Sequence, residues 1–420
     1  MKILCFCFLI LVTTSAFCQD NQWVTFNSSN SKLPSNQVNG IAVDSFGVKW
    51  IVAEKGLVKI DGSNWSIYDK SNSALTCPHP LGVAIEGQNI VWIATYCLGL
   101  VRFDGTNWTV YDTIKSPLPY RTVTSVAIDK QGNKWAGMVY GGVAKFDGTN
   151  WTFYNKINSP LPSNYVNCIA VDSKDEIWFG TDNGLAMFDG NNWTIYNKDN
   201  SPLPGNNVLS VSFDKKGIMW VGTKGQGIVQ HAGTTCDIYN TSNSGLKSNY
   251  VRTVYIDAQN QKWIGTETGG LNKLSASVWT IMDTSNSAIA GNYITTIVPD
   301  RNGSKWIGTF NRGLSVYSDT HTGVNNGLQD GVIHSYSLSQ NYPNPFNPST
   351  RISYTIPDQE FVSLKIYNLL GSEIATIVNE VKQAGQHSVE FNASFLPSGV
   401  YMYTIHAGAF KESRKLLLMK

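Results

Sequence analysis

The sequence predicts an all-β protein, in which a seven-bladed β-propeller is followed by a small C-terminal β-sandwich. Tryptophan recurs in two columns, 27 positions apart, and 15 or 16 further residues lead to the next repeat. Short strand patterns separated by turn residues fill each repeat, and such a period is typical of propellers with one blade per repeat. The first column is Trp23, Trp65, Trp108, Trp151, Trp193, Cys236 and Trp279, and the second is Trp50, Trp92, Trp135, Trp178, Trp220, Trp263 and Trp306.

The fourth repeat shows how one blade is expected to fold. Its residues 166–171, 177–180, 185–188 and 193–196 read as four short antiparallel strands with turn residues between them. An acidic residue recurs at the first turn of every repeat, where its carboxylate can accept hydrogen bonds from the amides of that turn. The column is Asp44, Glu86, Asp129, Asp172, Asp214, Asp257 and Asp300. A metal-binding role is the less favoured reading, because one carboxylate per blade leaves the copies far apart.

The two ends of the repeat region predict how the ring closes. The last repeat, residues 293–317, supplies three strands and no fourth, whereas residues 23–26 form a fourth strand that precedes the first full set. We therefore expect the N-terminal strand to complete the seventh blade, which leaves no exposed sheet edge at the junction. The propeller is expected to span residues 19–317.

Composition and the N-terminus indicate an exported protein. Residues 1–18 read as a signal peptide, with Lys2 before an apolar run and cleavage expected between Cys18 and Gln19. No other stretch is long and apolar enough to predict a transmembrane segment. The formal net charge is +2 and no basic stripe occurs, so nucleic acid is not an expected partner.

Four cysteines remain after removal of the signal peptide. Cys77 lies in the connection that precedes the second blade, and Cys97 lies in a turn between the second and third strands of that blade. In a four-stranded meander both loops lie on the same face, so we predict a Cys77–Cys97 disulfide, which export permits. Cys168 and Cys236 fall on an inner and an outer strand, and we expect both to be free and buried.

The best candidate for a binding site is the mouth of the central channel. Two positions just before each first strand carry mostly polar or aromatic residues, which suit a polyhydroxylated ligand because tyrosine stacks on sugar faces and amides bond to hydroxyls. For the first position, which is mostly asparagine, the alternative is that it caps loop backbone. The predicted ligand-binding residues are Gln37, His79, Arg121, Tyr165, Asn207, Tyr250 and Tyr293.

The repeats resemble the two-component-regulator propeller repeat, as in the segment Ile256-Asp-Ala-Gln-Asn-Gln-Lys-Trp-Ile-Gly-Thr-Glu-Thr-Gly-Gly-Leu271. The resemblance covers residues 23–317. It implies the propeller fold, and in that family the repeat forms periplasmic sensor domains, several of which sense polysaccharide fragments.

The last part of the chain changes in composition. Residues 318–335 read as a polar linker, and residues 336–420 as a sandwich with strands at 362–367, 387–391 and 400–405. This domain resembles the type A sorting domain of the type IX secretion system of Bacteroidetes-like bacteria. The carrying residues are Asn341-Tyr-Pro-Asn-Pro-Phe-Asn-Pro-Ser-Thr350, Leu369-Leu-Gly371, Ala384-Gly-Gln-His387, Leu396-Pro-Ser-Gly-Val-Tyr401 and the terminal Lys411–Lys420. The resemblance implies the type IX secretion machinery as a partner and a secreted protein or one attached to the outer cell surface.

Signals for catalysis are thin. No metal-ligand spacing, nucleophile elbow or phosphate loop occurs, so no catalytic residue, metal or cofactor is predicted. The leading hypothesis is a non-enzymatic binding propeller for a glycan or another surface protein. The alternative is a polysaccharide lyase or hydrolase, for which His79 is the one histidine expected at the mouth. A purely structural adhesin is a third possibility.

Overall fold

The computed structural model describes residues 23–318 and 336–419, apart from residues 78, 88, 233, 234, 342, 358, 369, 370, 384 and 409. The predicted signal peptide, its cleavage site at Cys18 and Gln19, and all of the predicted linker beyond residue 318 lie outside the described residues. The chain forms two compact units, one on each side of residues 319–335.

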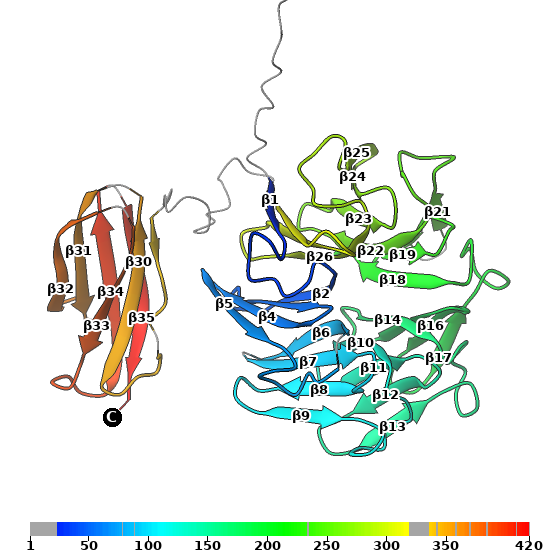
Figure 1. The fold of residues 1–420 in the computed structure, drawn as a ribbon, viewed down its shortest axis with the longest axis horizontal. Coiled ribbons are helices and arrows are strands. Elements are labelled where there is room, and N and C mark those ends of the chain that lie inside the picture. The colour runs from blue at the N-terminus through cyan, green and yellow to red at the C-terminus, as the bar shows by residue number, and fades with distance from the viewer. Residues whose placement is uncertain are drawn as a thin grey trace, which may run out of the picture. The chain divides into compact units, whose positions relative to one another are not determined.

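Seven four-stranded antiparallel sheets make up the described part of the first unit, and the predicted fold class is confirmed (Figure 1). Blade 1 is β2 (Val38–Val43), β3 (Lys49–Ala53), β4 (Gly56–Asp61) and β5 (Asn64–Tyr68); blade 2 is β6 (Pro80–Glu86), β7 (Ile90–Thr95), β8 (Leu100–Phe103) and β9 (Trp108–Tyr111). Blade 3 is β10 (Val123–Ile128), β11 (Lys134–Met138), β12 (Gly142–Phe146) and β13 (Trp151–Tyr154); blade 4 is β14 (Val166–Val171), β15 (Ile177–Thr181), β16 (Gly184–Phe188) and β17 (Trp193–Tyr196). Blade 5 is β18 (Val208–Phe213), β19 (Met219–Thr223), β20 (Ile228–Ala232) and β21 (Thr235–Tyr239); blade 6 is β22 (Val251–Ile256), β23 (Lys262–Thr266), β24 (Leu271–Ser275) and β25 (Val278–Met282). Blade 7 is β26 (Ile294–Pro299), β27 (Lys305–Thr309), β28 (Leu314–Tyr317) and the N-terminal β1 (Trp23–Phe26).

The ring closes between blade 7 and blade 1. β1, drawn in dark blue, pairs antiparallel with β28 of the last repeat, with Trp23 opposite Tyr317 (Figure 1). The first strands contact one another in order around the ring, and β2 contacts β26. The Thr295 hydroxyl donates to the carbonyl of Val38 over 2.6 Å, so a hydrogen bond also joins the two blades. The predicted closure by the N-terminal strand is therefore present in the structure.

Every first strand contains a register shift near its beginning, which the sequence pattern did not predict. In blade 4 it lies between Val166 and Cys168, and the other six blades shift at the equivalent place. A β-bulge bends the strand and re-aims its side chains. Beyond the shift, the small first-strand residue of each blade faces the second strand. The opposed pairs are Gly40–Val52, Gly82–Ala94, Ser125–Gly137, Cys168–Gly180, Ser210–Gly222, Thr253–Gly265 and Thr296–Gly308.

These opposed pairs compensate each other in size. Where the first strand has Ser, Cys or Thr, the second strand has Gly, and where the first strand has Gly, the second has Val or Ala. A Cβ added at Gly180 would lie 2.5 Å from the Cys168 sulfur and 2.7 Å from a methyl of Val208 in the next blade. The close contact between first and second strands therefore admits one side chain of limited volume per blade.

The second tryptophan column is buried between blades, with each indole 7% exposed or less. The acidic column has a second role besides its turn: one carboxylate oxygen accepts from the indole N–H six residues later, as in Trp135–Asp129 (2.8 Å) and Trp263–Asp257 (2.8 Å). In blades 1 and 5, by contrast, the indole makes no such bond: Trp50 Nε1, the second Asp44 oxygen and Trp220 Nε1 are all buried without a partner.

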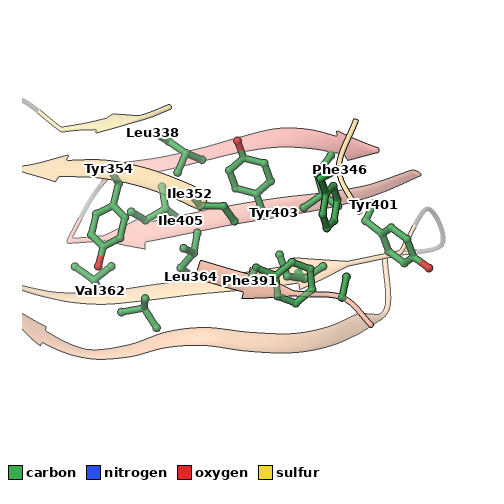
Figure 2. Close-up of a cluster of buried hydrophobic side chains, with 14 of the residues drawn as sticks. Leu338, Phe346, Ile352, Tyr354, Val362, Leu364, Phe391, Tyr401, Tyr403 and Ile405 are labelled. Atoms are coloured by element: carbon green, nitrogen blue, oxygen red, sulfur yellow. The ribbon is translucent and has the colours of Figure 1, made fainter. Parts of the chain in front are cut away.

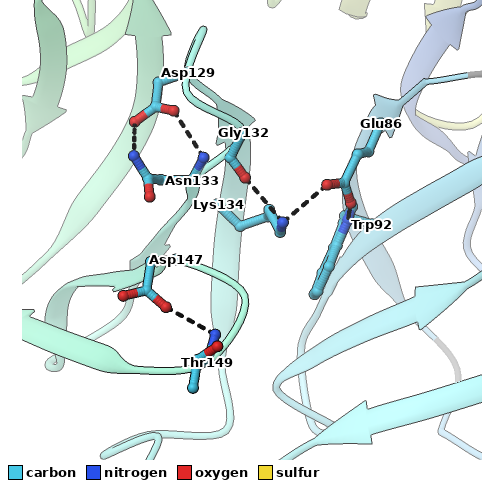
Figure 3. Close-up of polar contacts among 8 residues, drawn as sticks. All are labelled: Glu86, Trp92, Asp129, Gly132, Asn133, Lys134, Asp147 and Thr149. Carbon is cyan, nitrogen blue, oxygen red and sulfur yellow. Dashed lines mark hydrogen bonds and ion pairs between the residues drawn. The ribbon is translucent and has the colours of Figure 1, made fainter.

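Blades are also tied by buried lysines, as Figure 3 shows for Lys134. The Lys134 ammonium of blade 3 lies 2.9 Å from Glu86 Oε1 of blade 2 and 2.8 Å from the Gly132 carbonyl oxygen. The other Glu86 oxygen accepts from Trp92 Nε1 over 2.7 Å. Burial acts against ionisation, yet the hydrogen bonds from Trp92 and Lys134 hold the pKa of the Glu86 carboxyl below its ordinary value.

The second unit is a β-sandwich of a three-stranded and a four-stranded sheet in the described residues. The first sheet is β29 (Ser337–Leu338), β30 (Ser349–Ile356) and β33 (Gly385–Asn392), and the second is β32 (Glu373–Lys382), β31 (Glu360–Tyr367), β34 (Gly399–Ala407) and β35 (Phe410–Leu418). The three predicted strands correspond to β31, β33 and β34. The sequence prediction missed β29, β30, β32 and β35; in β32, an edge strand, most side chains are at least partly exposed, so no buried face marks it.

Inward-facing side chains of both sheets form the core of this unit, including Ile352, Leu364 and Ile405 (Figure 2). The proline-rich segment before β30 is anchored by its ends: Asn341 Nδ2 donates to Thr350 Oγ1 over 2.9 Å, and both residues are 2% exposed. Phe346 between them is buried and exchanges backbone hydrogen bonds with Leu417 and Met419. This segment therefore fixes the end of β35.

Candidate functional site

One face of the propeller carries two kinds of loop, which we call the rim: the residues just before each first strand and the turns between second and third strands. A backbone hydrogen bond joins the two kinds in every blade, and in six of the seven its carbonyl belongs to a predicted binding residue; the exception is Thr122 of blade 3. The donor–acceptor pairs are Glu54–Gln37, Tyr96–His79, Val139–Thr122, Asp182–Tyr165, Lys224–Asn207, Glu267–Tyr250 and Phe310–Tyr293. The predicted placement of both loop types on one face is thus present in the structure.

The asparagine position of the rim caps loop backbone, the alternative that the sequence left open. The Asn164 side-chain oxygen accepts from the Lys156 amide over 2.9 Å, and Asn206 accepts from Lys198 over 2.8 Å. Equivalent bonds are made by Asn36, Asn249 and Asn292. Arg121 occupies this same position in blade 3, and its Nε donates to Thr113 Oγ1 over 3.0 Å.

Two of the predicted binding residues, Tyr165 and Asn207, line one pocket of about 360 Å³ at the start of the first strands of blades 4 to 6. Asn167 connects the blades there, donating to the Val208 carbonyl over 2.8 Å. Tyr250 pairs through its backbone with Lys224 at this pocket. Apart from Leu209, the lining is polar and of mixed charge: Tyr165, Asn167, Asp182, Asn207, Lys224 and Arg252.

Tyr293, another predicted residue, has its ring covered by neighbours. Phe310 stacks on it with ring centroids 4.9 Å apart and planes 20° from parallel, and the Arg252 guanidinium lies 5.2 Å from the ring centroid. Arg252 in turn forms an ion pair with Glu267 at 3.4 Å. Burial raises the pKa of the Tyr293 hydroxyl above its ordinary value. A ring occupied in this way has little surface left to stack on a ligand.

Two open tyrosines on the same rim were missed by the sequence analysis. Tyr120 precedes β10 and is 45% exposed, and Tyr140 lies in the turn between β11 and β12 and is 67% exposed. Their ring centroids are 6.4 Å apart, and Tyr140 lies 6.2 Å from Tyr165 with the planes 87° apart. In the sequence Tyr140 stands out only as a departure from the repeat, because no other blade has an aromatic residue at the Tyr140 position.

On the rim of blades 1 and 2 a histidine lies next to a carboxylate. His79 Nδ1 lies 3.7 Å from Glu54 Oε1, and the His79 ring lies edge-on to Tyr96 at 6.3 Å. His79 has a positive φ of 82°, rare for a residue with a side chain. Cys77 and Cys97 are joined by a disulfide with Cα atoms 6.3 Å apart, which fixes the two loops that carry His79 and Tyr96.

The two remaining cysteines are free, but each residue is partly exposed, so the prediction that both are buried was wrong for the residues as a whole, although the Cys168 thiol itself is buried. Gln37 donates to Asn39 Oδ1 over 3.1 Å and is thereby held in the rim of blade 1. Within the residues that the structure describes, no three His, Cys, Asp or Glu side chains gather as a metal site. Nor does any helix in that part of the chain have the length and apolar character needed to cross a membrane.

A wider depression of about 450 Å³ lies beside the loop before β26. It is lined by Asn292, whose side chain already accepts from the Thr284 amide, and by Arg312. None of the predicted binding residues lines it. The pocket at Tyr165 therefore remains the better candidate site.

Two family models match parts of the chain. Residues 340–419 match the secretion system C-terminal sorting domain, and residues 160–183 and 202–225 match the two component regulator propeller. The suspected combination of families is thus confirmed. A C-terminal sorting domain of this kind indicates a secreted protein or one attached to the cell surface. No curated protein matches the sequence.

Solved structures share the fold at low identity. The extracellular domain of a hybrid two component system from B. thetaiotaomicron is 18% identical, with a TM-score of 0.62 over 94% of this chain and 57% of that one. PorZ, a surface component of the type-IX secretion system of Porphyromonas gingivalis, is 17% identical, with a TM-score of 0.58 over 92% and 60%. Virginiamycin B lyase from Staphylococcus aureus is 13% identical, with a TM-score of 0.58 over 71% and 99%. The chain thus spans less than two thirds of the first two structures, and these likenesses concern the fold alone.

Proposed function

We propose that this protein is a binding propeller without enzymatic activity, exported by type IX secretion machinery that its C-terminal domain engages, and that it binds a glycan at the rim. The observation that carries the proposal is the open tyrosine pair at Tyr120 and Tyr140, continuous with the pocket at Tyr165. Exposed tyrosine rings beside amide and charged groups suit a ligand with apolar ring faces and many hydroxyls.

A glycan array with the purified full chain tests this proposal. Wild type is compared with Tyr165→Ala and Asn207→Ala, which alter the pocket, and with Phe46→Ala. Phe46 is another exposed aromatic residue, at 54%, but it follows Asp44 in a first-to-second-strand turn, on the face away from the rim. We expect the two pocket variants to lose signal and Phe46→Ala to keep it. Binding that is indifferent to both pocket variants would place the site elsewhere and refute the proposal.

An enzyme is the second candidate, because of the His79–Glu54 pair at the rim of blade 2. A histidine next to a carboxylate can accept and return a proton, which a lyase or hydrolase requires. Ser35 donates to the other Glu54 oxygen over 3.0 Å, so the carboxylate is oriented. Virginiamycin B lyase shows that this fold can carry a lyase, although fold likeness transfers no site. Turnover of polysaccharides or cyclic esters that is abolished by His79→Ala and by Glu54→Gln would favour this candidate over binding.

A further inference from the structure

We infer that the rim ligand is a neutral, linear oligosaccharide of at least three sugar units, which lies across Tyr120 and Tyr140 and reaches the pocket at Tyr165. This inference rests on the proposed function and names the ligand class of that same site. Three features carry it: which ring faces are free, how the rings lead into the pocket, and how the charges of the pocket balance.

The first feature is the contrast between two sets of rim aromatics. Tyr293 is stacked on Phe310 at 4.9 Å and has Arg252 at its ring, so its faces are in use. The rings of Tyr120, Tyr140 and Tyr165 lie farther apart, at 6.4 and 6.2 Å, with planes tilted by 56° and 87°. Rings at these tilts are not stacked on one another, and Tyr140 is the most exposed tyrosine among the described residues, at 67%.

The second feature is continuity. Tyr140 is held in its turn with a φ of 68°, in the left-handed region that disfavours residues with a side chain. Its neighbour Tyr165 belongs both to the row of rings and to the lining of the pocket, where Asn207 adds a side-chain amide; the Asn167 amide nitrogen already donates to Asn207 Oδ1 and to the Val208 carbonyl. A ligand bound in the pocket therefore meets the open rings as it extends toward blade 3, which a single sugar would not reach.

The third feature is charge. Lys224 and Arg252 are the cations of the pocket, and Asp182 is its anion. Arg252 is already paired with Glu267 at 3.4 Å, so two acids accompany two bases. Counted with Glu267, which pairs with Arg252 beside the pocket, the charges cancel, so an acidic sugar gains no net attraction, while amides and tyrosines bind neutral hydroxyls and ring faces. The balance favours a neutral chain over a uronate or sulfated one.

Isothermal titration of the full chain with oligosaccharide ladders from two to six units tests the inference. The neutral probes are β-1,4-glucan, β-1,4-mannan and α-1,4-glucan oligomers, and the acidic probes are oligogalacturonides. We expect the affinity for one neutral ladder to rise by about three- to tenfold as each open tyrosine is reached, and then to level off. Tyr140→Ala should remove this gain with length.

The controls separate this inference from the proposed function. Tyr140→Phe keeps the ring and should keep the length dependence, and Phe46→Ala should behave as wild type at every length. Asn207→Ala should weaken all lengths alike. Four outcomes would each overturn the inference: affinity that does not depend on length, a length dependence that Tyr140→Ala leaves unaltered, no binding of any neutral ladder, or a preference for oligogalacturonides. In each case glycan binding on the array that depends on the rim would leave the proposed function standing. Absence of binding to any glycan on the array would instead refute the function.

Discussion

The first two strands of the blades and the rim above them obey different rules. Inside the blades each position repeats seven times, and where one residue changes its partner changes with it, as Gly40 and Val52 replace the Cys168–Gly180 type of pair. On the rim the backbone bonds and the capping asparagines repeat, while the other side chains differ from blade to blade. The difference teaches that repetition marks packing, whereas departures from the repeat mark the positions free to bind something.

The largest loss of stability is expected when one opposed pair of the first two strands is overfilled. Gly180→Val would place a side chain 2.5 Å from the Cys168 sulfur and 2.7 Å from Val208, so we expect a loss of unfolding free energy. The loss should be about 3 kcal/mol, the upper part of the usual range for overpacked cores. Urea unfolding followed by tryptophan fluorescence measures it.

The matched control copies blade 1 into blade 4. Cys168→Gly combined with Gly180→Val recreates the Gly40–Val52 arrangement, and should recover part of the loss. Recovery stays partial because Val208 stands where blade 2 has the first-strand residue Pro80. A double variant as unstable as the sum of its single variants would show that the pairs do not compensate each other.

Two tryptophans test whether the indole–carboxylate bond matters within the interior. Trp135 donates to Asp129 over 2.8 Å, whereas Trp50 Nε1 has no partner. Both indoles are nearly fully buried and both have a lysine at about the same distance, 5.3 Å for Lys145 and 5.5 Å for Lys59. Replacement of either indole by Phe removes similar volume, but only Trp135→Phe removes a hydrogen bond to a carboxylate; Asp129 Oδ2 then keeps Asn133 Nδ2 as its donor, at 2.7 Å. We expect Trp135→Phe to cost about 2 kcal/mol more than Trp50→Phe in thermal or urea unfolding, and equal costs would contradict this.

Cys168 gives the interior a pH dependence. Burial raises the pKa of its thiol to about 12, from an ordinary value near 9.0. A raised pKa in the folded state means that stability is complete below pH 9 and is lost as pH rises toward 12, by about 1.4 kcal/mol per pH unit. Cys168→Ser keeps the residue size found in blades 3 and 5 and lacks this titration. The difference in unfolding free energy between wild type and Cys168→Ser should therefore decrease from pH 9 to pH 10, and a constant difference would contradict the prediction.

The sequence predicts the interior far better than the rim, for a physical reason. Strand positions such as Trp178 follow from the alternation of apolar and polar residues and from the same residue type at that position in every repeat. Strands 166–171 and 193–196 were therefore predicted with the bounds that the structure has. The bulge before Cys168 was not predictable, because the alternation of the strand continues through it. Whether a rim ring is open depends on contacts far apart in sequence, such as Arg252 with Tyr293. Comparison of repeats therefore favoured Tyr293 and passed over Tyr140.

The smallest expected effect on stability concerns two tyrosines of the rim, one open and one covered. Tyr140→Ala removes a ring that is 67% exposed, so the unfolding free energy should change by less than about 0.5 kcal/mol. Tyr293→Ala removes a ring that Phe310 and Arg252 contact, and should cost about 1 kcal/mol more. Thermal unfolding of the two variants side by side measures the difference. If Tyr140→Ala proved as destabilising as Tyr293→Ala, the open ring would itself be part of the packing, and its exposure would no longer support a binding role.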